Sequence, residues 1–125
     1  GVFFKSRDPK ALAAWYAEHL GFRLVKTVGG PTDIHFLADD AGSLLEFYRS
    51  PAAPVPDYAV MSPYTLHLAF AVQDVALERA RLVAGGATAV GETETNAGGD
   101  DLAFLRDPWG VALQLVRRAA PWPAR

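Results

Sequence analysis

The stretch VFFKSRD at residues 2–8 decides the fold, because it returns as LAFAVQD at residues 68–74. The offset between the two copies is constant at 66 residues (74 minus 8). Further along, LLEF at residues 44–47 aligns with ALQL at residues 112–115, at an offset of 68 (114 minus 46). Two stretches that recur in the same order indicate an internal repeat, so the chain is predicted to consist of two similar halves.

Each half is predicted to contain a strand, a helix and three further strands. A bulky apolar run ends at Asp8 in the first half and at Asp74 in the second, and aspartate is a favoured N-cap. Pro9 suits the first helical position, and apolar residues then recur at helical spacing. Turn-forming residues separate the apolar runs that follow. The predicted strands cover residues 2–6, 22–28, 33–37, 43–49, 66–72, 88–90, 102–105 and 111–116, and the predicted helices cover about 9–20 and 75–84.

This order predicts an α+β fold in which two βαβββ repeats form a curved-sheet barrel or cup. A half of about 60 residues can hardly bury the face of its own sheet, so the halves are expected to share a core. We therefore predict a single domain over residues 1–125, with half-units at about 1–49 and 65–118. The Pro-rich stretch 50–64 is predicted to connect them without a regular element.

Composition excludes several classes of protein. The 125 residues carry a net charge of −2, and the basic ones are scattered, which argues against nucleic-acid binding. The absence of cysteine excludes disulfides, zinc–cysteine sites, iron–sulfur clusters and thiol nucleophiles. No apolar run reaches the roughly 18–20 residues that span a bilayer, so we expect a cytoplasmic protein with no membrane partner.

Strand alternation predicts one polar side chain on an otherwise small or apolar face in three strands. These side chains are Glu46, His67 and Gln114, and we expect them to converge on one concavity. Three aromatic residues on or near this face predict a ligand pocket. A fourth aromatic residue, in a turn, is predicted to act as a lid over the pocket or to form a subunit contact. The predicted pocket residues are Phe3, Tyr48, Phe104 and Trp109.

The other two histidines are predicted to have ordinary roles. His35 is expected to be an exposed strand residue, and His19 to interact with the helix dipole in the last turn. The acidic stretch 92–101 is predicted to be a solvated, mobile loop that could gate the pocket.

Three segments together resemble the vicinal oxygen chelate superfamily, which includes glyoxalase I, bleomycin resistance proteins and extradiol dioxygenases. They are HLAFAVQD (67–74), LLEF (44–47) and FLRDPWGVALQL (104–115). The resemblance runs over nearly the whole chain and implies a glyoxalase-like domain that binds a small molecule and forms a homodimer.

The resemblance also implies a set of metal ligands. Members that bind metal use four strand positions, which correspond here to Gly1, Glu46, His67 and Gln114. Gly1 has no side chain, although a terminal amine or an upstream residue could take its place. The other three would suit Zn²⁺, Ni²⁺, Mn²⁺ or Fe²⁺. Gln114 cannot act as a general base, so the catalytic role would belong to Glu46.

Two functions follow from the resemblance. One is a divalent-metal-dependent lyase or isomerase that acts on a small oxygen-bearing substrate. The alternative is a metal-free protein that binds a small molecule or an antibiotic, like the bleomycin resistance proteins. An extradiol dioxygenase is disfavoured. Members of that group use two histidines and one glutamate as metal ligands, and His67 is the one of these three ligands that this sequence retains.

Overall fold

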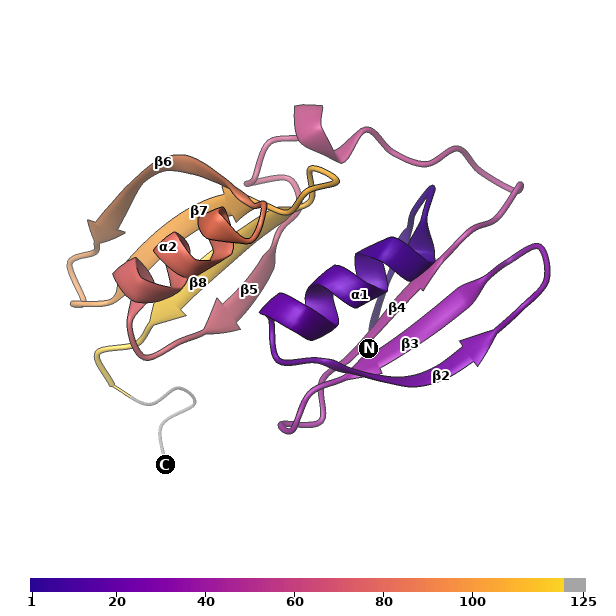
Figure 1. The fold of residues 1–125 in the computed structure, drawn as a ribbon. Coiled ribbons are helices and arrows are strands. Elements are labelled where there is room, and N and C mark those ends of the chain that lie inside the picture. Colours follow the sequence, from indigo (N-terminus) through magenta and orange to yellow (C-terminus); the bar gives the residue numbers. More distant parts are fainter. Residues whose placement is uncertain (121–125) are drawn as a thin grey trace. The chain divides into compact units, whose positions relative to one another are not determined.

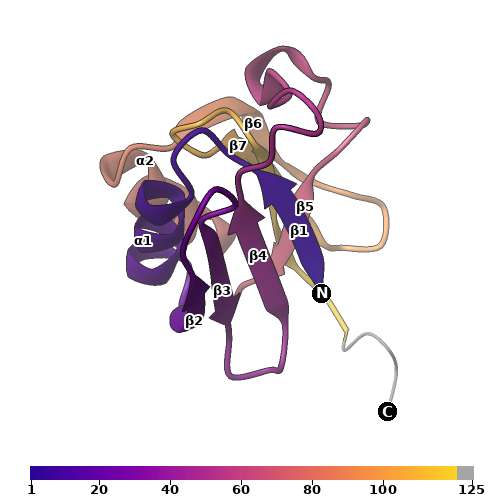
Figure 2. The ribbon, with the colours of Figure 1, turned by 90° about the vertical axis from the view of Figure 1, so that its right-hand side faces the viewer.

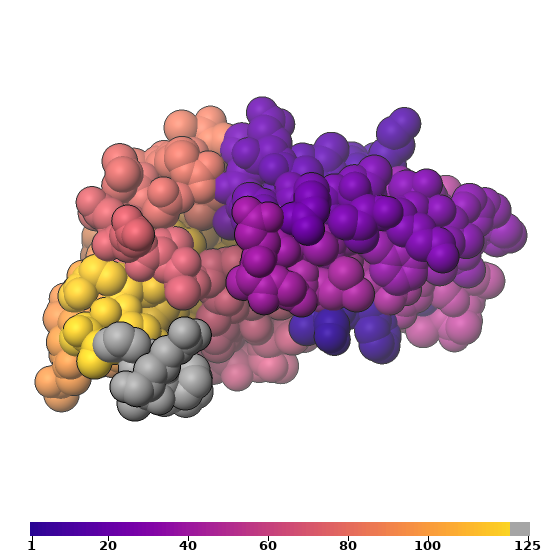
Figure 3. Space-filling view, turned by 90° about the horizontal axis from the view of Figure 1, so that it is seen from below, coloured from indigo at the N-terminus to yellow at the C-terminus, as the bar shows by residue number. Residues whose placement is uncertain are grey.

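The computed structural model describes residues 1–120, which form two compact units, Gly1–Pro56 and a second that begins at Asp57. Each unit contains a four-stranded mixed sheet and one α-helix (Figure 1). The space-filling view shows each as a closely packed body, the first in indigo to magenta and the second in pink to yellow (Figure 3). The α+β class and the two βαβββ repeats are confirmed. The single domain over 1–125 stays a prediction, and its residues 121–125 lie outside the described residues.

The first unit has the strand order β1-β4-β3-β2. Its outer strand β1 runs parallel to β4, and the other neighbours are antiparallel (Figure 2). A register shift between Leu24 and Lys26 marks a bulge in the opposite outer strand, β2. The elements are β1 (Val2–Lys5), α1 (Pro9–His19), β2 (Arg23–Val28), β3 (Ile34–Ala38) and β4 (Leu44–Tyr48).

Helix α1 begins and packs as its sequence predicts. The Asp8 carboxylate accepts a hydrogen bond from the Ala11 amide at 3.1 Å, and Pro9 occupies the first turn. The buried face of the helix contacts the sheet, where the rings of Tyr16 and Phe47 lie 5.0 Å apart at a steep angle. One face of this sheet is therefore covered by the helix of its own unit.

The second unit repeats this arrangement with the strand order β5-β8-β7-β6. Strand β5 runs parallel to β8, and the Asp74 carboxylate caps α2 by accepting from the Leu77 amide at 3.0 Å. The outer strand β6 carries a register shift between Val90 and Glu94. The elements are η1 (Tyr58–Val60), β5 (Leu68–Ala71), α2 (Val75–Ala84), β6 (Thr88–Thr95), β7 (Asp101–Arg106) and β8 (Ala112–Arg117).

Some predicted boundaries are wrong. Strand β6 runs through Thr95 and β7 begins at Asp101, so residues 92–95 and 101 of the stretch 92–101, predicted to be a loop, belong to strands. The Pro-rich stretch 50–64, predicted to lack regular structure, contains the short 3₁₀ helix η1. Strand β3 starts after Asp33 rather than at it, because Asp33 has a φ of 42°, in the left-handed region that no strand residue adopts.

The prediction that His35 is exposed is also wrong. His35 pairs in register with Phe47, whose ring packs under α1, so both residues point to the covered face. Its side chain is buried, and the Nε2 atom lies 2.9 Å from Oδ1 of Asp33. A histidine can occupy this apolar face because the aspartate satisfies its ring nitrogen.

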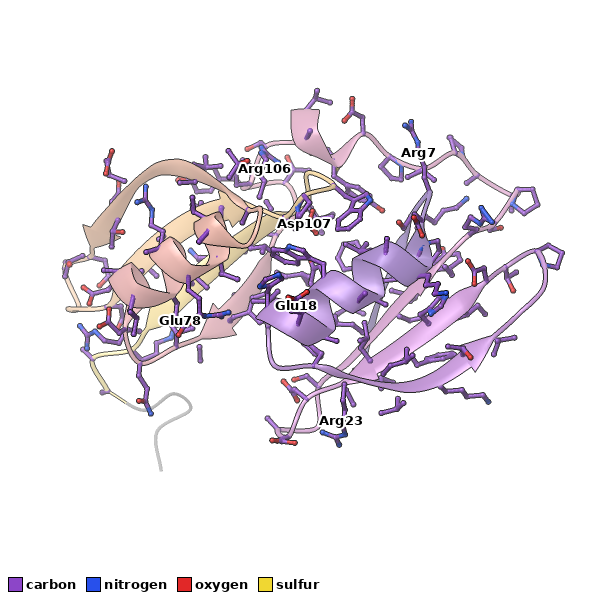
Figure 4. The ribbon with its side chains drawn as sticks, viewed as in Figure 1. Arg7, Glu18, Arg23, Glu78, Arg106 and Asp107 are labelled. Carbon is purple, nitrogen blue, oxygen red and sulfur yellow. The ribbon has the colours of Figure 1, made fainter. Side chains whose placement is uncertain are left out.

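The turn between β7 and β8 connects to η1 through Arg106 (Figure 4). The Arg106 guanidinium donates to the carbonyl oxygens of Tyr58, Met61 and Gly110 at 2.8–3.0 Å. Within the turn, the buried Asp107 carboxylate accepts from the amides of Trp109 and Val111. This network fixes the segment that follows Pro56 against the second sheet.

An ion pair joins the far ends of β7 and β8. Arg117 Nε donates to Asp101 Oδ2 at 2.7 Å, and the Thr95 hydroxyl donates to Oδ1 of the same carboxylate. These hydrogen bonds favour the ionised form and hold the pKa of Asp101 below its usual value. Of the helices formed by residues 1–120, none combines the length and the apolar character needed to cross a membrane.

Gly110 is expected to tolerate no side chain. Its φ is 96°, and an added Cβ would lie 2.7 Å from the amide nitrogen of Ala59 and 2.9 Å from its Cα. We expect Gly110→Ala to lower the free energy of unfolding by about 1–3 kcal/mol or more, measured by urea denaturation. Gly29→Ala is the matched control, because nothing lies within 4 Å of its added Cβ. Equal stability of the two variants would contradict this account of the turn.

The Asp101 pair is expected to stabilise the fold only while the carboxylate is charged. The pKa of Asp101 is lower in the folded protein than its usual value of 3.8. The stabilisation by the ion pair is therefore fully present above pH 3.8 and is lost as the pH falls through the lower pKa of the folded state. Asp101→Asn should therefore lower the melting temperature at neutral pH and have little effect in strong acid. The control is Asp57→Asn, since the Asp57 side chain makes no capping bond to η1. A melting-temperature difference that persists unchanged in strong acid would refute the assignment.

Candidate functional site

The uncovered face of the first sheet places a carboxylate among aromatic rings. Glu46 of β4 is paired in register with Phe3 of β1 on one side and with Phe36 of β3 on the other. Directly paired residues point to the same face of a sheet, so the two phenyl rings flank Glu46. Tyr48 lies two residues further along β4, and its ring is 5.9 Å from that of Phe3. Three predicted site residues, Phe3, Glu46 and Tyr48, thus lie together.

The Glu46 carboxylate has no cationic partner within residues 1–120. Arg49, the nearest cationic residue along the chain, lies beyond the end of β4 and forms no ion pair with Glu46. Phe3 remains 66% exposed beside the half-buried glutamate. The face therefore offers a negative charge and accessible rings, which are the groups that attract an organic cation.

The uncovered face of the second sheet places an imidazole beside a carboxamide. Gln114 of β8 is paired with Ala69 of β5 and with Phe104 of β7. His67 lies two residues before Ala69, and its ring centroid is 5.3 Å from that of Phe104, with the two rings nearly perpendicular. The predicted residues His67, Phe104 and Gln114 therefore lie together in the second unit.

The hydrogen bond of His67 defines its tautomer. The Nδ1 atom lies 2.7 Å from the carbonyl oxygen of Pro63. A carbonyl oxygen only accepts, so Nδ1 carries the proton and the neutral ring keeps a lone pair on Nε2. Histidine ligands of metals are commonly oriented by such a bond from the other ring nitrogen. The Nε2 atom of His67 can therefore accept a hydrogen bond or coordinate a cation.

The repeat explains why the two faces carry different chemistry. Gly1 lies two residues before Phe3, as His67 lies two residues before Ala69. A Cβ at Gly1 would lie 3.3 Å from the carbonyl oxygen of Leu44, closer than most such contacts. At these positions the first unit therefore has one side chain that could coordinate a cation, Glu46, and the second unit has two, His67 and Gln114.

The remaining predicted residue, Trp109, lies in the turn between β7 and β8, where its amide donates to Asp107 Oδ1 at 2.9 Å. Residues 1–120 contain no group of three or more His, Cys, Asp or Glu side chains that could hold a metal ion. The assignments of Glu46 as catalytic, and of Glu46, His67 and Gln114 as metal ligands, stay predictions.

Two aromatic residues were missed from the sequence. Phe36 flanks Glu46 as Phe104 flanks Gln114, and the repeat offset of 68 (104 minus 36) was a signal that could have revealed it. Tyr64 is 85% exposed, and its ring lies 5.6 Å from that of Phe104. It belongs to the Pro-rich stretch, where no periodicity indicates a side chain's direction.

Solved structures share this fold at low sequence identity. A glyoxalase family protein from Bacillus cereus is 21% identical, with a TM-score of 0.72, over 92% of this chain and 88% of that one. One from Enterococcus faecalis is 24% identical, with a TM-score of 0.68, over 93% and 92%. The bleomycin resistance determinant encoded on the transposon Tn5 is 23% identical, with a TM-score of 0.60, over 95% and 97%.

Among curated proteins, none matches the sequence. The family model described as the glyoxalase-like domain matches residues 1–116. This match covers both repeats and the positions of all the predicted site residues, and it confirms the resemblance to the vicinal oxygen chelate superfamily. The chain therefore belongs to the glyoxalase-like domain family.

Proposed function

We propose that the protein binds a small organic molecule that carries a cationic group and an aromatic body, and that this binding needs no metal ion. The observation that carries the proposal is the position of Glu46 between Phe3 and Phe36, with no cation paired to its carboxylate in residues 1–120. The cationic group would lie against the carboxylate, and the aromatic body against the rings.

The energetics of this face favour an organic cation over a neutral ligand. A cation over an aromatic ring gains about 0.5–2 kcal/mol, more when water is excluded. Coulomb attraction between the cation and the half-buried Glu46 carboxylate would add to this, because two charges near a protein surface attract more strongly than in bulk water. The exposed ring of Phe3 and the neighbouring ring of Tyr48 extend the apolar surface available to such a ligand.

The residues at the family's ligand positions also support a metal-free binder. Gly1 supplies no side chain, and Gln114 supplies a neutral carboxamide, a weaker ligand than a carboxylate. The fold is shared with the bleomycin resistance determinant of Tn5, a protein named for resistance to an antibiotic. A homodimer and a cytoplasmic location stay predictions alongside this function.

Neutralising Glu46 is expected to weaken cation binding. The probe is benzyltrimethylammonium, with benzyl alcohol as its neutral counterpart, and binding is followed by NMR titration. Glu46→Gln should weaken binding of the cation about tenfold, because it removes the Coulomb attraction, and leave the alcohol unaffected. Glu92→Gln, which removes a charge from exposed strand β6, is the matched control and should bind like the wild type. Equal affinity of Glu46→Gln and wild type for the cation would refute the proposal.

A metal-dependent lyase or isomerase is the second candidate, and the tautomer of His67 favours it. Glu46, His67 and Gln114 would hold a divalent ion, which when bound would act as a Lewis acid on adjacent oxygens of the substrate. Of these three residues, Glu46 is the one whose carboxylate can accept a proton from the substrate and return it to a neighbouring carbon.

Metal content separates the two candidates. The enzyme predicts a stoichiometric divalent ion, measured by mass spectrometry in protein purified without chelator. His67→Ala should then lose the ion, whereas His19→Ala, in the last turn of α1, should retain it. The metal-free binder predicts instead that wild-type protein treated with chelator binds benzyltrimethylammonium with undiminished affinity.

A further inference from the structure

A cavity lies within the first unit, at the ends of its two parallel strands. Its volume is about 470 Å³. Parallel strands end at the same edge of a sheet, so the residues after β1 and those after β4 meet there. Its lining includes Ser6, Arg7, Pro31, Arg49, Pro51 and Val55.

Hydrogen bonds hold the walls of this cavity in place. The Ser6 amide donates to the Tyr48 carbonyl at 2.9 Å, and the Arg49 amide donates to the Thr32 carbonyl at 2.7 Å. The Lys5 ammonium donates to the carbonyl oxygens of Ser50 and Ala53, which anchors the start of the Pro-rich stretch. The cavity is therefore formed before a ligand arrives, which lowers the entropic cost of binding.

Two positive charges border the cavity without a counterion. Neither Arg7 nor Arg49 forms a side-chain ion pair within residues 1–120. The neighbouring acidic residues have other partners, since Asp8 caps α1 and Asp33 binds His35. The side chain of Arg7 extends beyond the end of β1 (Figure 4). The two arginines that line this hollow supply positive charge, which attracts an anion that can accept several hydrogen bonds.

The rest of the wall is apolar. Pro31 and Pro51 belong to different loops, and Val55 lies in the Pro-rich stretch. Prolines offer rigid apolar surface without an amide donor, so this part of the cavity suits a hydrocarbon or aromatic group rather than water.

We propose that this cavity binds a small molecule in which a phosphate or carboxylate group is attached to an apolar body. Arg7 and Arg49 bind the anionic group, and the two prolines and Val55 contact the apolar body. The site differs from the Glu46 face in the charge of its ligand, and it uses none of the residues assigned there.

The test is an NMR titration with phenyl phosphate and with benzoate, which distinguishes the two sources of the anionic group. We expect at least one to bind, with shifts at residues 31, 49 and 55, and to bind more tightly than inorganic phosphate or phenol. Arg7→Gln and Arg49→Gln should each weaken that binding about tenfold. Arg23→Gln is the matched control, because the exposed Arg23 of β2 pairs with Asp40 and does not line the cavity. It should bind like the wild type.

The proposal is wrong if neither aromatic anion binds at saturating concentration, or if Arg23→Gln weakens binding as much as the two test variants do. It is also wrong if inorganic phosphate binds as tightly as phenyl phosphate, since the apolar wall would then contribute nothing. Glu46→Gln should leave anion binding unchanged, so failure of this site and failure of the cation-binding proposal can be told apart.

Discussion

The packing of one helix on one face of each sheet constrains every other side chain of that sheet. Tyr16 of α1 contacts Phe47 of β4, which commits the odd-numbered residues of β4 to the covered face. Alternation then turns Glu46 and Tyr48 to the other face. The same relation between α2 and β8 leaves Gln114 uncovered while Leu113 and Leu115 are fully buried. In both units, the packing of the helix on the sheet therefore determines which side chains lie on the uncovered face.

The repeat places equivalent side-chain positions in both units, and the residues at these positions differ between the two. Glu46 is flanked by two phenylalanines, whereas Gln114 is flanked by one phenylalanine and an alanine. The strand pairing is the same in both units, so it places side chains at equivalent positions whatever their chemistry. This is why the fold alone does not identify a reaction, and why the function rests on a few residues of each face.

Local signals in the sequence predicted the elements well. Asp8 and Asp74 located both helix starts, and helix α2 spans the predicted residues 75–84. Alternation placed Glu46 and Gln114 on the uncovered faces. The failures have a different physical origin: His35 faces the core because a residue two positions away, held in a left-handed conformation, satisfies its ring. Tyr64 and the pair Arg7 and Arg49 depend on where loops run, and loop paths follow from tertiary contacts that no periodicity records.

The bulges in β2 and β6 bear on behaviour at high concentration. An outer strand presents unpaired amides and carbonyls that can recruit a strand from another molecule. An irregular outer strand is a poor template for such edge-to-edge growth, because its donors and acceptors are out of step with those of a regular strand. Leu24, Val25 and Val28 of β2 are exposed, so this irregularity protects an apolar edge that would otherwise be prone to aggregation.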